Sequence, residues 1–433
     1  MILQTYQDRL LKVIPAGAHT YSRGFDQYPS NAPQILKNGL GAYVYDDKDN
    51  KYLDYGMALR AVNLGYANDK INQAAIKEIN NGNNLTRASM IELEAAELLV
   101  DLIPFVDMVK FTKNGSTATT AAIKLSRAYT NKTMVVRCAE HPFFSYDDWF
   151  IGSTPVTKGI KQDDIDNTKL FHYNDIKSLE NLFEKYSDQI ACVILEPATT
   201  EHPKDNFLHK VKELCLKYNA VFILDEMITG FRWSLGGACE YYKIEPDLVT
   251  YGKAMANGFS VACIAGKKEI MSLGSIEKKG SERLFLLSTT HGAEMCGLGA
   301  FVESIKFLRE NKVIDHLWDY GDKLIDIMNN KAKEYNISEY FIVDGISCSP
   351  YYLTYDKNKN LSLEFRTLFA QEMIKQGILI PWIALSYAHG KDELEFTKKA
   401  LNKVFSIYRK ALDEGIDKYL DGESIKPVFR KYN

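Results

Sequence analysis

The sequence predicts an α/β protein: a large domain with a mostly parallel sheet of seven strands, joined to a small α+β domain. Three observations predict this class. Helical and strand-like patterns alternate from about residue 68 to 320, as in βαβ units. Several strand-like segments are short apolar runs, which are typical of strands buried on both faces. Of 433 residues, 46% are hydrophobic and 25% are charged, as in an ordinary globular protein.

Within the predicted large domain, residues 68–320, the spacing of apolar residues defines the individual elements. Apolar residues recur at helical spacing in five segments, which are 68–80, 91–103, 117–129, 175–186 and 206–219. Seven strand-like runs separate them, at 109–112, 134–138, 190–195, 220–224, 247–250, 261–265 and 284–288. Ligands of open α/β sheets bind at the carboxyl ends of the strands, so residues just past these runs are the first candidates for a site.

The two ends of the chain are expected to form smaller parts. Residues 1–67 are assigned to an N-terminal segment with a short amphipathic helix and a hairpin at 42–54, either part of the small domain or a cover over the active site. Residues 321–433 are assigned to the small C-terminal domain. A helical pattern runs from about 297 to 336, and later elements are expected as strands at 341–355 and 377–388, helices at 361–375 and 392–412, and a charged surface tail at 413–433.

Composition argues against several function classes. A net charge of -3 gives no basis for binding nucleic acid or an anionic membrane. No apolar run is long enough to span a bilayer, and the N-terminus lacks the pattern of a secretory signal. The seven cysteines are scattered and never in CxxC spacing, so we expect buried free thiols in a reducing cytoplasm and no metal site.

Two charged residues stand just past apolar runs and could share one pocket. Asp225 closes the run 221–224, and Lys253 follows the run 248–252. Burial among apolar residues would lower the pKa of the lysine and make its amine a better nucleophile. The alternatives are an acid that caps a turn and a lysine that reaches the surface.

A turn of small residues precedes the predicted helix 117–129. Its sequence is KNGSTAT, with Gly115, Ser116 and Thr117 at the point where the helix begins. Unpaired N–H groups and the helix dipole make such a helix start an anion site. The alternative is an ordinary N-cap that binds no ligand.

Together these segments resemble the class III (ω-type) aminotransferases, close to the glutamate-1-semialdehyde 2,1-aminomutase branch. These are pyridoxal 5′-phosphate (PLP) enzymes of fold type I. The resemblance implies that Asp225 pairs with the pyridine nitrogen of PLP and that Lys253 forms the Schiff base with it. It also implies that Gly115, Ser116 and Thr117 hold the phosphate.

The same resemblance assigns residues to the two faces of the PLP ring. The run 143–152 stands where the family has an aromatic that stacks on the ring, and Phe143 takes that place. A phenylalanine supplies the flat apolar face that stacking needs. His141 is the competing candidate if the register shifts by two residues, and the alternative role for Phe143 is in a core aromatic cluster. Met227 is expected on the opposite face, a role that is compatible with core filling.

Two further cofactor contacts are implied by the resemblance. Glu196, at the end of the strand-like run 190–195, matches a glutamate that lies near the cofactor. Thr290 matches a threonine that reaches the phosphate of the neighbouring subunit, with Thr289 as the fallback. The alternatives are a strand-end carboxylate bound to nearby backbone and a hydroxyl that caps its own turn. The Thr290 match implies a homodimer with shared active sites.

Substrate recognition is expected to involve two arginines. Arg23 matches the arginine that binds the substrate carboxylate in the aminomutase, and the alternative is a surface arginine in a loop. Arg60 falls near the substrate mouth, where the family usually has a small residue. We therefore regard Arg60 as a candidate for substrate selection.

The leading hypothesis is an aminotransferase that moves an amino group from a donor to a carbonyl acceptor such as an aldehyde, a keto acid or a keto sugar derivative. The alternative is an intramolecular aminomutase of the glutamate-1-semialdehyde type. The region 151–175 is shorter and more charged than the mobile loop of that enzyme, which weakens this alternative. A non-catalytic PLP-binding protein is a third hypothesis, and the intact Asp225 and Lys253 argue against it.

Overall fold

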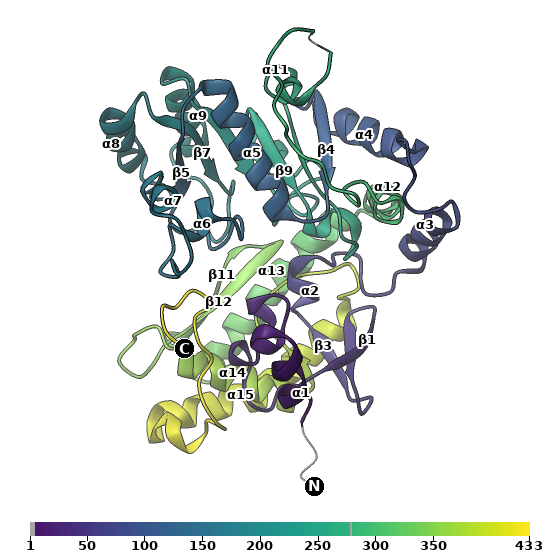
Figure 1. Cartoon of the computed structure of the whole chain (residues 1–433). Helices are drawn as coiled ribbons and strands as arrows, with labels where there is room; N and C mark the ends of the chain where they lie inside the picture. Colours follow the sequence, from purple (N-terminus) through teal and green to yellow (C-terminus); the bar gives the residue numbers. More distant parts are fainter. Residues whose placement is uncertain (1–4, 278) are drawn as a thin grey trace. The chain divides into compact units, whose positions relative to one another are not determined.

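The computed structural model describes residues 5–277 and 279–433 (Figure 1). The chain forms two compact units. Asp69–Ile314 and Lys431–Asn433 make up the large unit, and the described residues up to Asn68 together with Asp315–Arg430 make up the small unit.

The large unit is built on seven strands in the order β4-β10-β9-β8-β7-β5-β6. β10 is antiparallel to β4 and to β9, and all pairs from β9 to β6 are parallel. This mostly parallel sheet confirms the predicted α/β class. The strands are β4 (Met108–Thr112), β5 (Met134–Cys138), β6 (Thr168–Phe171), β7 (Ile190–Leu195), β8 (Val221–Asp225), β9 (Leu248–Tyr251) and β10 (Ala262–Gly266).

One of the seven predicted strands is wrong. Residues 284–288 have no regular secondary structure, and the seventh strand is β6. The apolar run at 284–287 misled the prediction because Phe285 is 63% exposed and only Leu286 is buried. β6 was missed because it is a four-residue edge strand in which only the first and last residues, Thr168 and Phe171, are buried.

The five predicted helices of the large unit are confirmed to within two residues at each end. α5 packs across the middle of the sheet, against β4, β7, β8, β9 and β10 (Figure 1). Its buried face carries small residues, which allow a close approach to the strands. The helices are α3 (Asp69–Asn80), α4 (Met90–Leu102), α5 (Gly115–Thr130), α6 (Asp148–Ile151), α7 (Gln162–Asp166), α8 (Ile176–Tyr186), α9 (Phe207–Lys217), α10 (Ala238–Tyr242), α11 (Lys268–Met271) and α12 (Met295–Glu310).

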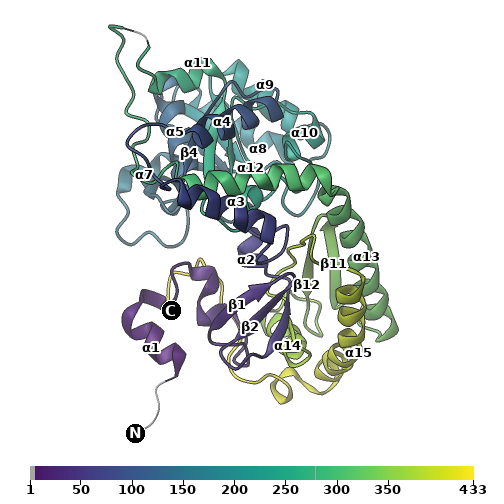
Figure 2. The same ribbon diagram turned by 90° about the vertical axis from the view of Figure 1, so that its right-hand side faces the viewer.

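The small unit joins segments from the two ends of the chain. β1 (Leu36–Leu40), β2 (Tyr43–Asp46) and β3 (Lys51–Asp54) form a sheet with β13 (Ile378–Leu379), which runs parallel to β3. Figure 2 shows these N-terminal strands in purple beside the green and yellow C-terminal elements. The pair β2–β3 is the predicted hairpin. Two further strands, β11 (Phe341–Ile346) and β12 (Ser349–Thr354), pair with each other.

Five helices of the small unit are relevant to the predictions. They are α1 (Tyr6–Val13), α2 (Met57–Arg60), α13 (Val313–Glu334), α14 (Leu363–Lys375) and α15 (Lys391–Glu414). The predicted N-terminal helix is therefore present as α1, and the first four residues of the chain lie outside the described part. The predicted strand 377–388 is wrong after Leu379. Pro381 follows closely and has no N–H group to donate to a neighbouring strand.

Two further features of the described residues concern membrane-spanning helices and cysteine thiols. Among the helices of the described residues, none combines the length and apolar character needed to cross a bilayer. All seven cysteines are free, and six of them are buried. Burial raises the pKa of the Cys192 and Cys263 thiols to about 12, which disfavours the reactive thiolate form.

Candidate active site

Met227 is the residue at which three segments of the candidate site meet. It lies two residues past Asp225, the last residue of β8, and is 7% exposed. A Cβ atom on Gly115 would lie 2.8 Å from the Met227 sulfur, and a Cβ atom on Gly252 would lie 2.6 Å from it. The start of α5, the end of β8 and the residue before Lys253 are therefore in direct contact.

Asp225 is a buried carboxylate with a fixed orientation. Its Oδ1 atom accepts hydrogen bonds from the Met227 N–H at 3.0 Å and from Thr250 Oγ1 at 2.8 Å. Burial raises the pKa of Asp225 to about 6, against the opposing effects of the Lys253 charge and these two hydrogen bonds. Both hydrogen bonds end on Oδ1, so the geometry leaves Oδ2 for a further cationic or N–H partner.

Lys253 begins the turn after β9 in an unusual backbone conformation. Its φ angle is +44°, in the left-handed region that L-residues rarely adopt. Strained backbone of this kind persists where the surrounding structure fixes it, and it is concentrated at functional sites. The charge of Lys253 acts on the pKa of Asp225, so the two side chains share one electrostatic environment.

The first turn of α5 has the form of an anion site with a built-in cap. Asn114 is the N-cap, and its Oδ1 accepts from the Thr117 N–H at 2.9 Å and from Thr117 Oγ1 at 3.0 Å. The amides of Gly115 and Ser116 come first in the helix and so have no carbonyl within it to bond. Asn114 is therefore the residue that caps α5. The first N–H groups of the helix can still bind an anion.

Phe143 presents an aromatic ring next to the start of α5. The ring is 47% exposed and contacts Phe150 edge-on, with centroids 5.6 Å apart. Its neighbour Phe144 is buried, and the Phe144 carbonyl accepts a hydrogen bond from Thr119 Oγ1 at 2.8 Å. This bond ties the Phe143 segment to α5, and the uncovered ring is free to stack on a flat ligand.

Glu196 and His141 lie together at the ends of β7 and β5. The Glu196 N–H donates to His141 Nδ1 at 2.9 Å, and Thr199 Oγ1 donates to the Glu196 carboxylate at 2.8 Å. Burial lowers the pKa of His141 to about 3, so its ring is neutral at physiological pH. In this structure His141 supports the backbone of Glu196, and Leu195 is paired with Leu224, the residue before Asp225.

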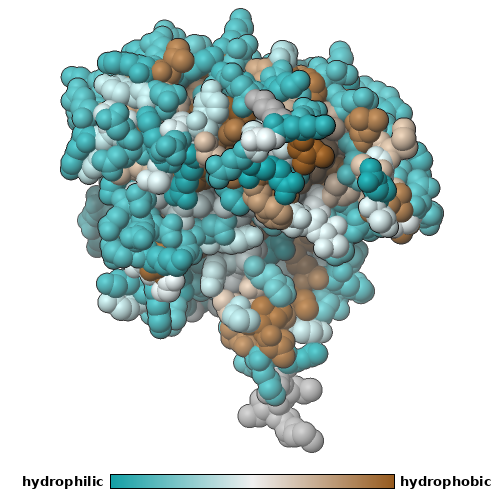
Figure 3. Space-filling view, turned by 45° about the horizontal axis from the view of Figure 1, so that its top comes forward, coloured by the Kyte–Doolittle hydropathy of each residue, from teal (hydrophilic) through white to brown (hydrophobic). Residues whose placement is uncertain are grey.

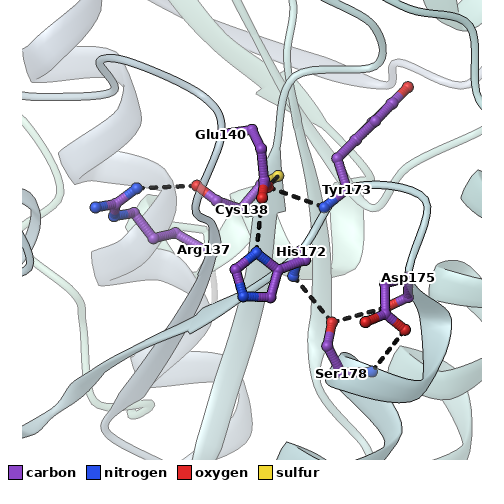
Figure 4. Close-up of polar contacts among 7 residues, drawn as sticks. All are labelled: Arg137, Cys138, Glu140, His172, Tyr173, Asp175 and Ser178. Atoms are coloured by element: carbon purple, nitrogen blue, oxygen red, sulfur yellow. Dashed lines mark hydrogen bonds and ion pairs between the residues drawn. The ribbon is translucent and has the colours of Figure 1, made fainter. Parts of the chain in front are cut away.

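A polar cluster next to this region joins the ends of β5 and β6 (Figure 4). The Glu140 carboxylate is hydrogen-bonded to His172 Nδ1 at 2.6 Å and accepts a hydrogen bond from the Tyr173 N–H at 2.9 Å. Burial raises the pKa of Glu140, and the hydrogen bonds from His172 and Tyr173 outweigh this effect and lower it to about 2. The His172 side chain is 62% exposed, and such surface pairs contribute little to stability. We interpret this cluster as a link between two strand ends.

The predicted Thr290 lies on an exposed turn of the large unit. Both Thr289 and Thr290 are exposed, and the Thr290 carbonyl accepts from Asn84 Nδ2 at 3.0 Å. An ion pair between Lys113 and Glu294 joins this turn to the segment that precedes α5. The hydroxyl of Thr290 is therefore on a surface that a second molecule could reach.

The two predicted substrate arginines lie in the small unit. Arg23 ends a short 3-10 helix and is exposed. Arg60 ends α2 and is half-buried. All of the predicted cofactor residues lie in the large unit.

Comparison with known proteins identifies the family of this chain. Residues 26–410 match the family model described as Aminotransferase class-III. The chain belongs to the class III aminotransferases. This confirms the family resemblance, the fold type I architecture and the dependence on PLP that its sequence predicts.

Relatives of this class III aminotransferase include a protein named as an aminomutase and one named as a transaminase. The glutamate-1-semialdehyde 2,1-aminomutase of Wigglesworthia glossinidia brevipalpis is 31% identical and covers 92% of this chain and 96% of its own length. The PLP internal aldimine form of the Sphingopyxis sp. MTA144 FumI protein is 25% identical, with a TM-score of 0.86 over 94% of this chain and 97% of its own. An omega-transaminase from Sphaerobacter thermophilus is 25% identical, with a TM-score of 0.83 over 93% and 97%.

The residues present fit the chemistry of PLP. A buried carboxylate whose pKa is raised to about 6 regains stability when a cation such as a protonated ring nitrogen pairs with it. The helix start at Gly115 suits a phosphate. The half-exposed Phe143 ring suits a stacked aromatic, and Lys253 supplies an amine beside Asp225.

Several supporting residues were not predicted from the sequence. Thr250 orients Asp225, and no sequence pattern indicates this contact because it depends on the register between β8 and β9. Asn114 caps α5. The buried carboxylate of Glu226 accepts from the N–H groups of Ala238 at 2.9 Å and Cys239 at 2.6 Å, and so fixes the chain after β8.

Substituting Gly252 by alanine is expected to weaken PLP binding. The new Cβ would lie 2.6 Å from the Met227 sulfur, and Gly115 confines that side chain as well. Such overpacking costs about 1–3 kcal/mol, which corresponds to about 5- to 150-fold in the PLP dissociation constant when the cost falls on the bound state. Fluorescence titration of the PLP-free protein with PLP measures this dissociation constant. Adding Met227→Ala should restore much of the affinity, and unchanged affinity in Gly252→Ala alone would refute the contact.

Proposed function

We propose that the chain catalyses the movement of an amino group with PLP, and that Lys253 and Asp225 are its catalytic residues. The observation that carries this proposal is the shared environment of a strained lysine and a buried carboxylate at the carboxyl ends of β9 and β8. Both are placed against the start of α5 through Met227.

Each residue has a distinct part in the proposed reaction. Bound PLP supplies an aldehyde that accepts an amine and a ring that withdraws electrons. Lys253 would hold it covalently, and the Lys253 amine, once released, would accept the proton from the carbon that bears the substrate nitrogen and donate the same proton to the carbon that becomes the new amine-bearing position. Asp225, held by Thr250, keeps a proton on the ring nitrogen through Oδ2.

The remaining large-unit residues are proposed to hold the cofactor. Gly115 and Ser116 would bind the phosphate through their backbone amides and the Ser116 hydroxyl, and Thr117 would join them by releasing a hydrogen bond to Asn114. Phe143 covers one ring face. Three further residues are proposed to support the cofactor. Met227 would lie beneath the ring, Glu196 near the cofactor, and Thr290 against the phosphate of a partner subunit.

The reaction proposed first is intramolecular, as in a glutamate-1-semialdehyde 2,1-aminomutase. The sequence pattern favoured transfer between two molecules, but the curated relatives of 29–31% identity are named as aminomutases and give the intramolecular reaction more weight. Transfer from an amino donor to a separate carbonyl acceptor is the second candidate. The observation that favours it is the ordered region 151–175, which forms α7 and β6 instead of a long loop.

The proposed assembly is a cytoplasmic homodimer. Exposed apolar side chains lie on α3 and α4 beside the Thr290 turn, and Figure 3 shows hydrophobic side chains at the surface among hydrophilic ones. The exposed apolar side chains on α3 and α4 include Ile76 at 44%, Ile79 at 51%, Met90 at 80% and Leu93 at 52% exposure. We propose that a second copy covers them and that Thr290 then contacts the phosphate site of that copy. Six buried free thiols suit a reducing compartment.

Two incubations of the PLP-loaded enzyme decide between the candidate reactions. In the first, glutamate 1-semialdehyde is supplied alone, and the aminomutase proposal predicts its isomer without any donor. In the second, single amino acids are supplied without an acceptor, and transfer between two molecules predicts stoichiometric pyridoxamine 5′-phosphate together with a keto acid. Chromatography of the products measures both. Neither product from any substrate would refute amino-group movement as the function.

A further inference from the structure

Phe143 lies in a segment that has no regular secondary structure. Residues 139–147 connect β5 to α6, and the Phe143 ring is 47% exposed, whereas Met227, proposed for the opposite face of the PLP ring, is buried. A side chain that becomes ordered only when a ligand binds lowers the affinity, because the ordering costs free energy. The contacts that hold this segment therefore decide how well Phe143 can stack.

Glu140 anchors the start of this segment to the end of β6 (Figure 4). The backbone pairing of β5 with β6 ends at the pair Cys138–Phe171. Beyond that point the Glu140 side chain continues the link, because Oε1 is hydrogen-bonded to His172 Nδ1 at 2.6 Å and Oε2 accepts from the Tyr173 N–H at 2.9 Å. The Cys138 thiol also donates to Oε2, at 3.3 Å. Both carboxylate oxygens are thus hydrogen-bonded.

His172 is itself anchored to the first turn of α8. Its backbone N–H donates to Ser178 Oγ at 2.9 Å, and the Ser178 N–H donates to Oδ1 of Asp175, the N-cap of that helix, at 3.2 Å. Burial raises the pKa of Glu140, but the hydrogen bonds from His172 and Tyr173 lower it to about 2, so the carboxylate is ionised at physiological pH. An ionised carboxylate only accepts hydrogen bonds, and His172 Nδ1 is therefore the donor.

The rest of the segment is anchored to two other elements of the large unit. His141 Nδ1 accepts from the Glu196 N–H at 2.9 Å, at the end of β7. The Phe144 carbonyl accepts from Thr119 Oγ1 of α5 at 2.8 Å. Phe143 lies between these anchors, so the position of its ring depends on contacts that the neighbouring residues make on both sides.

We propose that Glu140 and His172 are positioning residues that hold the segment 139–147 so that the Phe143 ring is set for stacking before PLP binds. This inference rests on the proposed function and adds to its cofactor site two residues that act through Phe143. The His172 and Glu140 side chains are 62% and 48% exposed, so their bond contributes little to folding stability. Its effect is expected in PLP binding, because a ring that is already ordered need not be ordered at that step.

The test compares the PLP dissociation constants of His172→Ala, His172→Gln and Glu140→Ala with that of the wild type, by fluorescence titration of the PLP-free proteins. We expect about three- to tenfold weaker binding in His172→Ala and Glu140→Ala, and a smaller loss in His172→Gln, whose amide can still donate to Glu140. Glu201→Ala is the matched control, because that carboxylate is 45% exposed, pairs with Lys204 at 2.6 Å and lies in the large unit. The control should bind PLP as the wild type does.

A double-mutant cycle with Phe143→Leu separates positioning from a general structural defect. Phe143→Leu should itself weaken PLP binding, because it removes the flat face for stacking. Adding His172→Ala to it should then cause less than about a twofold further loss, because the ring to be positioned is gone. The PLP-free His172→Ala protein should melt within about 4 °C of the wild type.

Three results would overturn the inference. They are unchanged PLP affinity in His172→Ala, an equal loss from His172→Ala with and without Phe143→Leu, and wild-type affinity in Phe143→Leu. The last of these would also remove Phe143 from the proposed cofactor site. Failure of the holoenzyme to move any amino group would refute the proposed function instead, and the PLP titrations would still decide the roles of Glu140 and His172, because they need no turnover.

Discussion

The variant Lys253→Ala is expected to lose at least about 10⁴-fold in turnover while still binding PLP. Removing the amine eliminates both a covalent partner and the group proposed to carry the proton, and proton transfer by a positioned side chain alone contributes about 10²–10⁴-fold. Single-turnover assays with the substrates of the two incubations measure the loss.

Two controls make the Lys253 result specific. Lys204→Ala removes an exposed lysine of the large unit that pairs with Glu201, and it should leave turnover unchanged. Added methylamine should restore part of the activity of Lys253→Ala, because a small amine can enter the space left by the side chain. Normal turnover in Lys253→Ala without added amine would exclude the proposed mechanism.

The second large effect is expected for Asp225→Asn. The amide cannot hold a proton on the ring nitrogen as a carboxylate does, and loss of one partner from a buried pair costs about 3–5 kcal/mol. This corresponds to a loss of roughly 10²- to 5 × 10³-fold in turnover. Steady-state kinetics at saturating PLP measures the loss of turnover. An unchanged rate would show that Asp225 does not pair with the ring nitrogen.

Asp225→Asn should have the opposite effect on the PLP-free protein. Burial raises the folded-state pKa of Asp225 from 3.8 to about 6, so the stability that this group contributes is complete below pH 3.8 and is lost as the pH rises through 6. The loss above pH 6 is about 3 kcal/mol at most. The PLP-free variant should therefore melt at a higher temperature than the wild type at pH 8, and this advantage should vanish near pH 4. A lower melting temperature at pH 8 would contradict the account.

The cofactor chemistry could be predicted from sequence because short apolar runs locate buried parallel strands. Asp225 and Lys253 each follow such a run, and parallel strands present their carboxyl ends at one edge of a sheet. The same rule failed at 284–288, where Leu286 is the one buried residue and Phe285 is exposed. Hydrophobicity alone does not distinguish an apolar run that is buried from one at the surface.

The contacts that fix these residues depend on tertiary structure and could not be predicted. Thr250 reaches Asp225 only because of the register between β9 and β8. No local pattern indicates the left-handed turn that ends at Arg60, because four L-residues with positive φ contradict local preference. That turn is held by contacts from residues distant in sequence as well as nearby ones: the Gly56 and Met57 N–H groups donate to the buried Asp54 carboxylate, and Trp382 Nε1 donates to the Gly56 carbonyl.

The central claim is that Lys253 is the residue that bonds PLP. Borohydride treatment of the holoenzyme fixes the cofactor on its lysine, and mass spectrometry of a proteolytic digest then locates it. The account predicts the added pyridoxyl mass on the peptide that contains Lys253, and its absence when PLP is removed before treatment. Pyridoxyl mass on another lysine, or on none, would contradict it.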